Sequence, residues 1–362
     1  MNDSFSSRPK LTLRVPVQHS YASRPTQTVV ITGGNHGLGF ACAETLAYAD
    51  KNWCVIIAGH DREKIVAATD KLRKKCNAKV EPMLLNLGSL RSIRYFAENL
   101  SDGLRDGCFP PLRALICNAG VHPATGLAYT ADGYEQTFGV NHLGHFLLVN
   151  LLLRQFSPPG RIIIVSGSPV NPLNLDWLRN RFSPLEAAGL AWPESPGGLH
   201  MNGFRRYRAS KHCNLLFAAE LDRRLANASP ETRLADITVN VFDPSVTPGT
   251  RLVRAWPRLL QRVWQSPTLH ALARCLGANL ATVERAGRSL AGLVLNPELE
   301  GVSGKYFRVL KERHVRDIVC NQALAKKLWL DSAEIVSWRR QADEYVHSPV
   351  FVSLEQRAFV LS

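Results

Sequence analysis

The chain has 362 residues, 45% of them apolar and 20% charged, so it is expected to fold as a globular protein with one large core or two smaller ones. No apolar run reaches the ~18 residues of a membrane-spanning helix, and the N-terminus lacks the apolar core of a signal peptide. The eight cysteines include no CxxC pair and no metal-ligand spacing, which argues against a disulfide framework and against a metal site. A reducing compartment, either the cytoplasm or an organelle interior, is therefore expected.

Positive charge is unevenly distributed along the chain. The formal net charge is +14, and residues 251–290 hold seven arginines against a single acid, Glu284. Apolar side chains are interleaved with these arginines, so residues 251–276 are expected to form a basic, amphipathic segment. It would be either a helical lid with solvated arginines or a peripheral contact with an anionic membrane surface. No nucleic-acid-binding module accompanies it, so nucleic acid is not an expected partner.

The first 26 residues differ in composition from the rest of the chain. Residues 1–26 are rich in Ser, Arg and Pro and contain one acid. This composition predicts a disordered tail, with an organelle-targeting segment as the alternative.

Apolar, β-branched runs alternate with helical patterns along the rest of the chain. Strands are expected at 28–32, 53–59, 80–87, 114–117, 161–167 and 237–243, and helices at 37–49, 61–76, 89–100, 134–156 and 203–226. Uniformly apolar strands are buried on both faces, and their alternation with helices indicates a parallel sheet between helical layers. The predicted fold is therefore α/β, a Rossmann-type doubly wound sheet in one domain over 27–320. A helical extension at 321–362 would pack on it.

The first strand is followed by a glycine-rich turn, TGGNHGLG, at residues 32–39. In doubly wound sheets, ligands bind beyond the carboxyl ends of the strands. Glycines at 33, 37 and 39 permit a tight turn, close approach of a pyrophosphate and close helix packing, while the helix N-terminus offers N–H groups to phosphate. The residues expected to bind a dinucleotide here are Gly33, Asn35, His36, Gly37, Leu38 and Gly39.

This TGxxxGxG spacing resembles the short-chain dehydrogenase/reductase family, and further motifs follow in the family's order. CNAG (117–120) resembles the family's NNAG motif, and GVNHLGHF (139–146) resembles the family's helix with an active-site Asn. YRASK (207–211) resembles the family's YxxxK motif, and DPSVTPGT (243–250) resembles the segment near the nicotinamide. SGKYF (303–307) resembles the terminal strand of the retinol-dehydrogenase-like members. The resemblance implies that the cofactor also contacts Asn118, Ala119, Gly120, Pro244 and Val246.

Tyr207 and Lys211 lie one helical turn apart in YRASK. A free phenol has a pKa near ~10, and an ammonium about 6 Å away on the same helix face favours the phenolate. Lys211 is therefore expected to lower the pKa of Tyr207, which would act as the general acid/base. The resemblance further implies that both residues contact the cofactor, that Lys211 binds the nicotinamide ribose, and that Asn141 holds a water in a proton relay.

The family's serine, which polarises the substrate carbonyl, has no direct equivalent. The position expected for it falls on Gly167 in IVSGSPVNP, between Ser166 and Ser168. Either serine would reach the substrate if the strand end were bulged by one residue, and Ser168 is the preferred candidate.

Residues after the second strand indicate which nicotinamide cofactor is preferred. NAD specificity usually needs an acid at the strand end, and this position is Gly59. Related reductases carry ACRD here, so His60 occupies the place of their phosphate-binding Arg, with Arg62 nearby. The pocket is therefore expected to prefer NADP, with NAD as the alternative. Asn86, followed by Leu87, replaces the family's Asp beside the adenine and still accepts a hydrogen bond.

A 38-residue insertion separates Ser168 from Tyr207. It contains the large apolar side chains Trp177, Phe182, Leu185, Leu190, Trp192 and Leu199. Such an insertion at the mouth of an active site predicts a lid for a bulky apolar substrate. A similar insertion occurs in light-dependent protochlorophyllide reductases. The cysteine that those enzymes carry after the sixth strand is absent here, where the chain reads Pro244, Ser245, Val246.

We therefore predict an NAD(P)-dependent oxidoreductase that transfers hydride between nicotinamide and the carbonyl or alcohol of a bulky apolar substrate. The alternatives are a protochlorophyllide-reductase-like enzyme that reduces a double bond, and a non-catalytic NADP-binding sensor or scaffold. Many family members pair through the helices corresponding to 134–156 and 203–226, so the resemblance also implies a homodimer.

Overall fold

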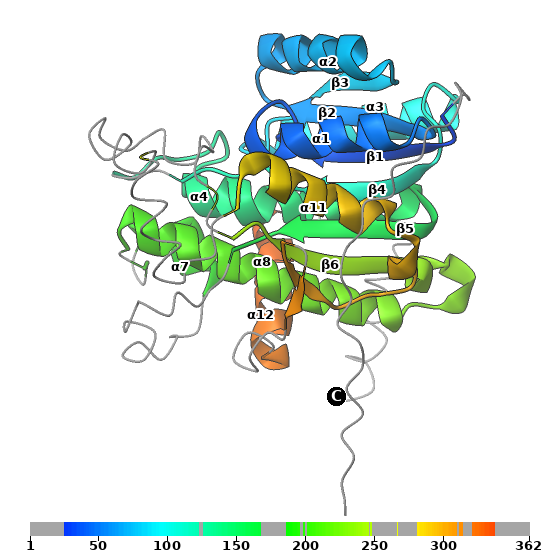
Figure 1. Ribbon diagram of the computed structural model, residues 1–362. Helices are drawn as coiled ribbons and strands as arrows, with labels where there is room; N and C mark the ends of the chain where they lie inside the picture. The colour runs from blue at the N-terminus through cyan, green and yellow to red at the C-terminus, as the bar shows by residue number, and fades with distance from the viewer. Residues whose placement is uncertain are drawn as a thin grey trace, which may run out of the picture.

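The apolar strands lie side by side in one sheet in a computed structural model of the chain (Figure 1). The structure describes residues 25–122, 126–167, 186–195, 198–199, 201–245, 247, 266, 281–309, 311–313 and 321–336. Within these residues the sheet has eight strands in the order β3-β2-β1-β4-β5-β6-β7-β8. They are β1 (Gln27–Thr32), β2 (Trp53–Gly59), β3 (Val80–Leu84), β4 (Leu112–Cys117), β5 (Phe156–Val165), β6 (Ile237–Asp243), β7 (Tyr306–Arg308) and β8 (Lys311–Arg313).

Strands β1 to β7 are parallel, and β8 returns antiparallel along β7. Because β1 pairs with both β2 and β4, the chain changes direction across the sheet at β1. In doubly wound sheets a ligand site forms at this switch point, beyond the carboxyl ends of the strands. The predicted α/β fold is confirmed.

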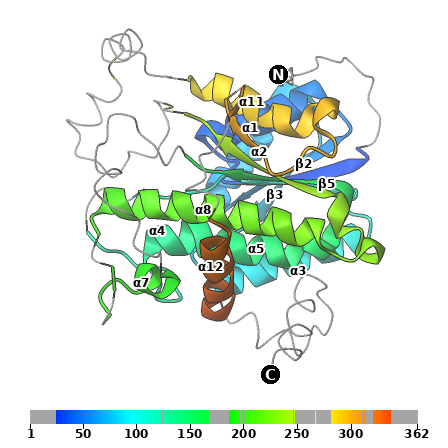
Figure 2. The ribbon, with the colours of Figure 1, turned by 90° about the horizontal axis from the view of Figure 1, so that it is seen from below.

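Helices cover both faces of the sheet (Figure 2). Helices α1 (Gly37–Ala49), α2 (Arg62–Cys76) and α11 (Val283–Leu295) lie on one face, and α3 (Leu90–Arg105), α5 (Gly144–Leu152) and α8 (Gly203–Ala226) lie on the other. Each face has its own buried apolar cluster, which explains why every residue of β2 is buried. Strands buried on both sides read as continuous apolar runs in the sequence.

The helix predicted at 134–156 is interrupted. It consists of α4 (Gln136–Phe138), the π-helical turn η1 (Gly139–Leu143), α5 and the 3₁₀ turn η2 (Leu153–Gln155). The π-helical turn contains Asn141, and such turns are rare and often occur at functional sites. Apolar periodicity does not reveal one extra residue in a helical turn, so the sequence predicted one continuous helix.

Several other boundaries differ from the predicted ones, among them the starts of β4 at Leu112 rather than residue 114 and of β5 at Phe156 rather than residue 161. Strand β3 ends at Leu84 rather than at residue 87, because Asn86 Oδ1 accepts a hydrogen bond from the Gly88 N–H at 2.9 Å and forms a turn. Helix α3 continues to Arg105, and β5 ends at Val165, two residues before the predicted end.

The C-terminal part of the described chain forms α12 (Gln322–Ile335), which crosses the outer side of α8 (Figure 2). Short helices α7 (Ala187–Ala191), η3 (Pro230–Thr232), η4 (Leu234–Asp236) and η6 (Pro297–Leu299) complete the described elements. No helix within the described residues is both long and apolar enough to cross a membrane.

Candidate active site

The glycine-rich turn connects β1 to α1 at the switch point. Gly33 and Gly37 have φ angles of +66° and +54°, which favour glycine. A Cβ added to Gly39 would lie 2.5 Å from the Gly33 carbonyl oxygen, so only glycine allows α1 to approach the turn this closely. The His36 side chain makes no capping hydrogen bond at the N-terminus of α1. The turn therefore has the shape and the N–H groups that a bound phosphate requires.

Thr32 at the end of β1 joins the glycine-rich turn to the CNAG segment after β4. Its hydroxyl accepts hydrogen bonds from the N–H groups of Asn118 and Ala119, both at 2.9 Å. The Asn118 amide donates to the Thr32 carbonyl at 2.8 Å. His145 Nε2 also lies 2.9 Å from this hydroxyl, and the ring's Nδ1 lies 3.1 Å from the Asn141 carbonyl oxygen.

The tautomer of His145 follows from these partners. Its ring is buried, and burial lowers its pKa to about 4, so the ring is neutral at pH 7. A carbonyl oxygen accepts only, so Nδ1 carries the proton and Nε2 accepts from the Thr32 hydroxyl. The sequence prediction did not identify Thr32 and His145, although both belong to motifs quoted for the family.

Asn141 is held in a fixed orientation by its neighbours. Its side chain accepts from the Val121 N–H at 2.8 Å and donates to the Val121 carbonyl at 3.1 Å and to Ser210 Oγ at 3.0 Å. A Cβ added to Gly120 would lie 3.2 Å from Asn141 Oδ1 and 3.8 Å from Lys211 Nζ. The CNAG segment, Asn141 and Lys211 therefore meet at one point.

Helix α8 brings Tyr207 and Lys211 to the same end of the sheet. Lys211 Nζ donates to the Val165 carbonyl at the end of β5, at 3.0 Å, and lies 5.8 Å from the centroid of the Tyr207 ring. The Tyr207 ring lies against the His122 ring, with centroids 4.3 Å apart. The side chains of Tyr207 and Lys211 therefore both lie near the CNAG segment, and Lys211 Nζ lies close to Gly120.

The sequence predicted that the pKa of Tyr207 is lowered, and this direction is wrong for the protein without a cofactor. Burial, with a smaller effect from Asp243, raises the pKa of Tyr207 above its usual value. Burial also lowers the pKa of Lys211 to about 8, although Asp243 opposes this shift. The cost of burying a charged group outweighs the attraction between ammonium and phenolate. Spacing along a helix does not show how deeply a pair is buried.

Asp243 is a buried charge near the pair that the sequence prediction did not single out. It ends β6, where Oδ2 accepts from the Tyr306 hydroxyl at 2.6 Å and from Arg308 Nε at 2.8 Å, while Oδ1 accepts from the Ser245 N–H at 2.8 Å. These donors satisfy the carboxylate, as a buried charge requires.

Of the two serine candidates, the structure describes Ser166 but not Ser168. Ser166 is buried, and its hydroxyl donates to the Lys211 carbonyl at 2.8 Å, so it is directed toward the α8 backbone. A Cβ added to Gly167 would meet no other atom within 4 Å, and Ser168 lies outside the described residues.

The expected adenosine end of the site lies after β2. A Cβ added to Gly59 would come 2.8 Å from Ile65 Cγ2 and 3.4 Å from Asn35 Oδ1, so an acidic side chain does not fit there. Next to Gly59, His60 and Arg62 are exposed.

Asn86, Leu87, Pro244 and Val246 complete the positions expected to contact the cofactor. Asn86 is exposed and Leu87 is buried. Pro244 follows β6, and its carbonyl accepts from Thr247 Oγ1 at 2.9 Å. Val246 lies outside the described residues.

Part of the predicted lid is described. Leu190 is buried in α7, Leu199 is half-buried, and Trp192 is 37% exposed with its ring 5.6 Å from that of Tyr134. The predicted lid residues Trp177, Phe182 and Leu185 lie outside the described residues, as does 251–276 except residue 266.

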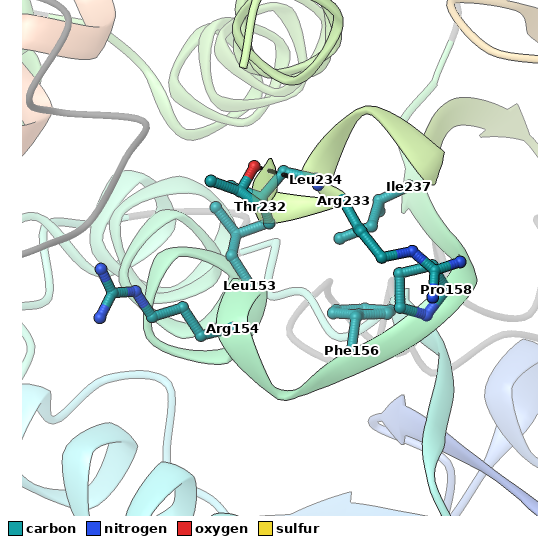
Figure 3. A pocket seen from close by; sticks show the side chains of 8 residues that line it. All are labelled: Leu153, Arg154, Phe156, Pro158, Thr232, Arg233, Leu234 and Ile237. Carbon is teal, nitrogen blue, oxygen red and sulfur yellow. Dashed lines mark hydrogen bonds between the residues drawn. The ribbon is translucent and has the colours of Figure 1, made fainter. Parts of the chain in front are cut away.

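A separate cavity of about 250 Å³ lies at the opposite end of the strands (Figure 3). Its lining includes Phe156 and Ile237, the first residues of β5 and β6, whereas Lys211 contacts the last residue of β5. Figure 3 shows Arg233 extending toward Pro158 while Arg154 points away from it. This cavity is therefore not part of the candidate active site.

Comparison with known proteins agrees with this geometry. The family model for short chain dehydrogenase matches residues 27–170. Retinol dehydrogenase 13 of Homo sapiens is 34% identical over 320 residues, 88% of this chain and 86% of that protein. Polyprenol dehydrogenase of Homo sapiens is 32% identical over 329 residues, 87% of this chain and 86% of that protein.

Solved structures show the same fold. The short chain dehydrogenase from Burkholderia cenocepacia J2315 in complex with NADP is 19% identical, with a TM-score of 0.55 over 79% of this chain and 97% of that chain. NAD+-bound xylitol dehydrogenase is 14% identical, with a TM-score of 0.53 over 79% and 98%. At this identity the likeness concerns the fold alone. The family assignment rests on the sequence identity to the two human dehydrogenases, which extends over 87–88% of this chain. This protein is therefore an oxidoreductase of the short-chain dehydrogenase family.

Proposed function

We propose that this protein is an NADP-dependent reductase of bulky apolar ketones or aldehydes, with Tyr207 as the proton donor. The observation that carries the proposal is the convergence of Lys211, Asn141 and Gly120, where a Cβ added to the glycine would lie 3.8 Å from Lys211 Nζ and 3.2 Å from Asn141 Oδ1. Tyr207 lies one turn before Lys211 on the same helix, α8. A proton donor and a cation therefore lie beside the CNAG segment, which Thr32 connects to the glycine-rich turn.

The residues present fit a dinucleotide. A Cβ added to Gly37 would meet nothing within 4 Å, so open space lies beside the N-terminus of α1, where N–H groups can bind a phosphate. Solved structures in complex with NADP or NADPH share the fold, which supports a nicotinamide cofactor here. When bound, the reduced cofactor supplies a hydride to the carbonyl carbon.

The pKa shifts of Tyr207 and Lys211 set the protonation states of the pair at neutral pH. The raised pKa of Tyr207 keeps its phenol protonated at neutral pH, ready to donate to the carbonyl oxygen as that oxygen gains charge. Lys211, with a pKa of about 8, is mostly an ammonium at pH 7 and stabilises the phenolate that proton donation leaves. The carbonyl gains a hydride and a proton, and the product is the alcohol.

The surroundings of Gly59 support a preference for NADP. At position 59, Ile65 and Asn35 leave no room for the acidic side chain that would bind the ribose hydroxyls of NAD. The nearby acid, Asp61, caps α2 by accepting from the Lys64 N–H at 3.1 Å and pairs with the Lys64 ammonium. The exposed side chains of Arg62, a cation, and His60, a hydrogen-bond donor, remain to bind the additional phosphate of NADP.

The apolar side chains near the mouth support a bulky apolar substrate. Phe204 and Trp192 are 47% and 37% exposed, and the Phe204 ring lies 6.1 Å from that of His122, which in turn lies against Tyr207. The names of the human relatives, retinol dehydrogenase and polyprenol dehydrogenase, point to the same substrate class.

The direct test is a screen of NADPH oxidation against ketones and aldehydes of increasing apolar size, with NADH in parallel. We expect turnover that rises with substrate size and is faster with NADPH. Illumination with protochlorophyllide and NADPH tests the double-bond alternative. Tight NADPH binding without turnover of any carbonyl would support the sensor alternative and contradict the proposal.

A further inference from the structure

We propose that Ser332 of α12 is a positioning residue of the active site, which acts through His142 to hold the π-helical turn that carries Asn141. This inference rests on the proposed function for the role of Asn141. Ser332 is 190 residues from His142 in sequence, and the two side chains meet only in the folded chain.

The turn η1 directs two neighbouring side chains to different partners. Asn141 bonds to Val121 and to Ser210 of α8, next to the site. His142 enters the core under α12, where Nε2 lies 2.9 Å from Ser332 Oγ. Both members of this pair are buried, with exposures of 1% for His142 and 0% for Ser332. Because Asn141 and His142 are consecutive residues of η1, a shift of the His142 backbone would also move Asn141.

The rest of the His142 environment is largely aromatic. Its ring stacks on Phe138 at 5.1 Å, and the rings of Phe146 and Phe217 lie 6.1 and 6.0 Å away. Burial lowers the pKa of His142 to about 3, although a side-chain hydrogen bond with Asn214 raises it by a smaller amount, so the ring is neutral at pH 7. Aromatic neighbours define the plane of the ring but do not distinguish its two orientations about the Cβ–Cγ bond, which exchange nitrogen and carbon positions. The hydrogen bond to Ser332 Oγ selects one of these orientations, because its direction is specific.

Helix α12 is itself firmly anchored to the same region. The Trp329 ring lies 4.9 Å from that of Phe146 and 4.3 Å from the Arg224 guanidinium. At the end of the helix, the Ile335 carbonyl accepts from the Tyr134 hydroxyl at 2.9 Å. The Ser332 hydroxyl is thus presented from a fixed support, as a positioning group requires.

The test combines kinetics with hydrogen exchange on the full-length chain. Ser332→Ala is expected to lower kcat about ten-fold, because a small displacement of a catalytic group has effects of this size, and to change the Kd for NADPH less than about two-fold. In the Asn141→Ala background the same substitution is expected to have no further effect on kcat. Amides of residues 139–143 should exchange faster in Ser332→Ala than in the wild type, without any substrate.

The control is Leu330→Ala on the same helix, because Leu330 is 38% exposed and should change neither readout. An equal loss of kcat in both Asn141 backgrounds would overturn the proposal, as would unchanged exchange at 139–143. If the wild type turns over no carbonyl, the proposed function fails, and the exchange measurement alone then decides whether Ser332 holds the turn.

Discussion

Lys211 is a cation in a place where burial disfavours charge. Its ammonium donates to the Val165 carbonyl, and burial lowers its pKa from 10.5 to about 8. The fold therefore binds this proton less strongly than the unfolded chain does, and the charged form destabilises the native state. The charge is retained where the proposed reaction needs it, beside the phenol of Tyr207.

Replacement of Lys211 makes this cost measurable. The cost is present below pH 8 and disappears as the pH rises from the folded pKa of about 8 toward the unfolded value of 10.5. The unfolding free energy of the wild type relative to Lys211→Met should therefore increase between pH 7 and pH 10, by on the order of 3 kcal/mol. Urea unfolding of both chains across this range is the measurement. A difference that does not change with pH would contradict the buried ammonium.

Tyr207→Phe removes only the hydroxyl from a ring that lies against His122. We expect turnover to be abolished while the Kd for NADPH changes little, because the ring still fills its place and only the proton donor is lost. Turnover measured with saturating NADPH, and binding measured by titration of the cofactor's fluorescence, separate the two effects. Unchanged turnover would rule out Tyr207 as the acid/base.

At the level of elements, the contact between α1 and the glycine-rich turn joins folding to cofactor binding. Gly39 of α1 and Gly33 of the turn touch through their backbones, and the Asn118 amide also lies 2.6 Å from where a Gly39 Cβ would be. A side chain at position 39 would have to displace backbone rather than a flexible side-chain end. The shape of the glycine-rich turn and the packing of α1 therefore change together, and with them the proposed phosphate site.

Gly39→Ala should consequently affect both properties. We expect NADPH affinity to fall about ten-fold or more and the unfolding free energy to fall by about 1–3 kcal/mol, as in other overpacked sites. Isothermal titration and urea unfolding measure the two changes. Tyr48→Ala is the matched control, because Tyr48 is on the same helix and 60% exposed. Wild-type affinity in Gly39→Ala would show that the cofactor does not use this turn.

At the scale of the whole molecule, α12 completes the core on the face of α5 and α8. Trp329 is 1% exposed, and its ring lies 4.9 Å from that of Phe146 and 5.7 Å from that of Phe217. Residues far apart in the sequence thus share one apolar cluster. The family resemblance implies dimerisation through these same helices, and α12 crosses α8 on its outer side (Figure 2).

Trp329→Ala should destabilise the chain by about 3–5 kcal/mol, since it removes a large buried ring and leaves a cavity. Urea unfolding followed by circular dichroism measures the loss. Leu330→Ala serves again as the control and should cost less than about 0.5 kcal/mol. A loss below 1 kcal/mol for Trp329→Ala would mean that α12 is not docked in solution as described here.

Most of the fold was predictable because its signals are local. The strands at 53–59 and 237–243 and the helices at 37–49 and 203–226 agree with β2, β6, α1 and α8 to the residue. Each combines a clear apolar pattern with a terminal signal, such as Asn202, whose side chain caps α8 by accepting from the Arg205 N–H. The predicted boundaries that were wrong include the π-helical turn, the starts of β4 and β5, and the ends of β3, α3 and β5, and they depend on single hydrogen bonds or tertiary contacts.

By itself, the sequence determined the α/β fold, the family, and the residues expected to form the site, because turns, caps and apolar periods act over a few neighbouring residues. Only the tertiary structure decided that Tyr207 is less acidic than usual and that Ser332 reaches His142. Both depend on burial and on contacts between distant segments, since the cost of a buried charge and the direction of a hydrogen bond are set by everything packed around the group.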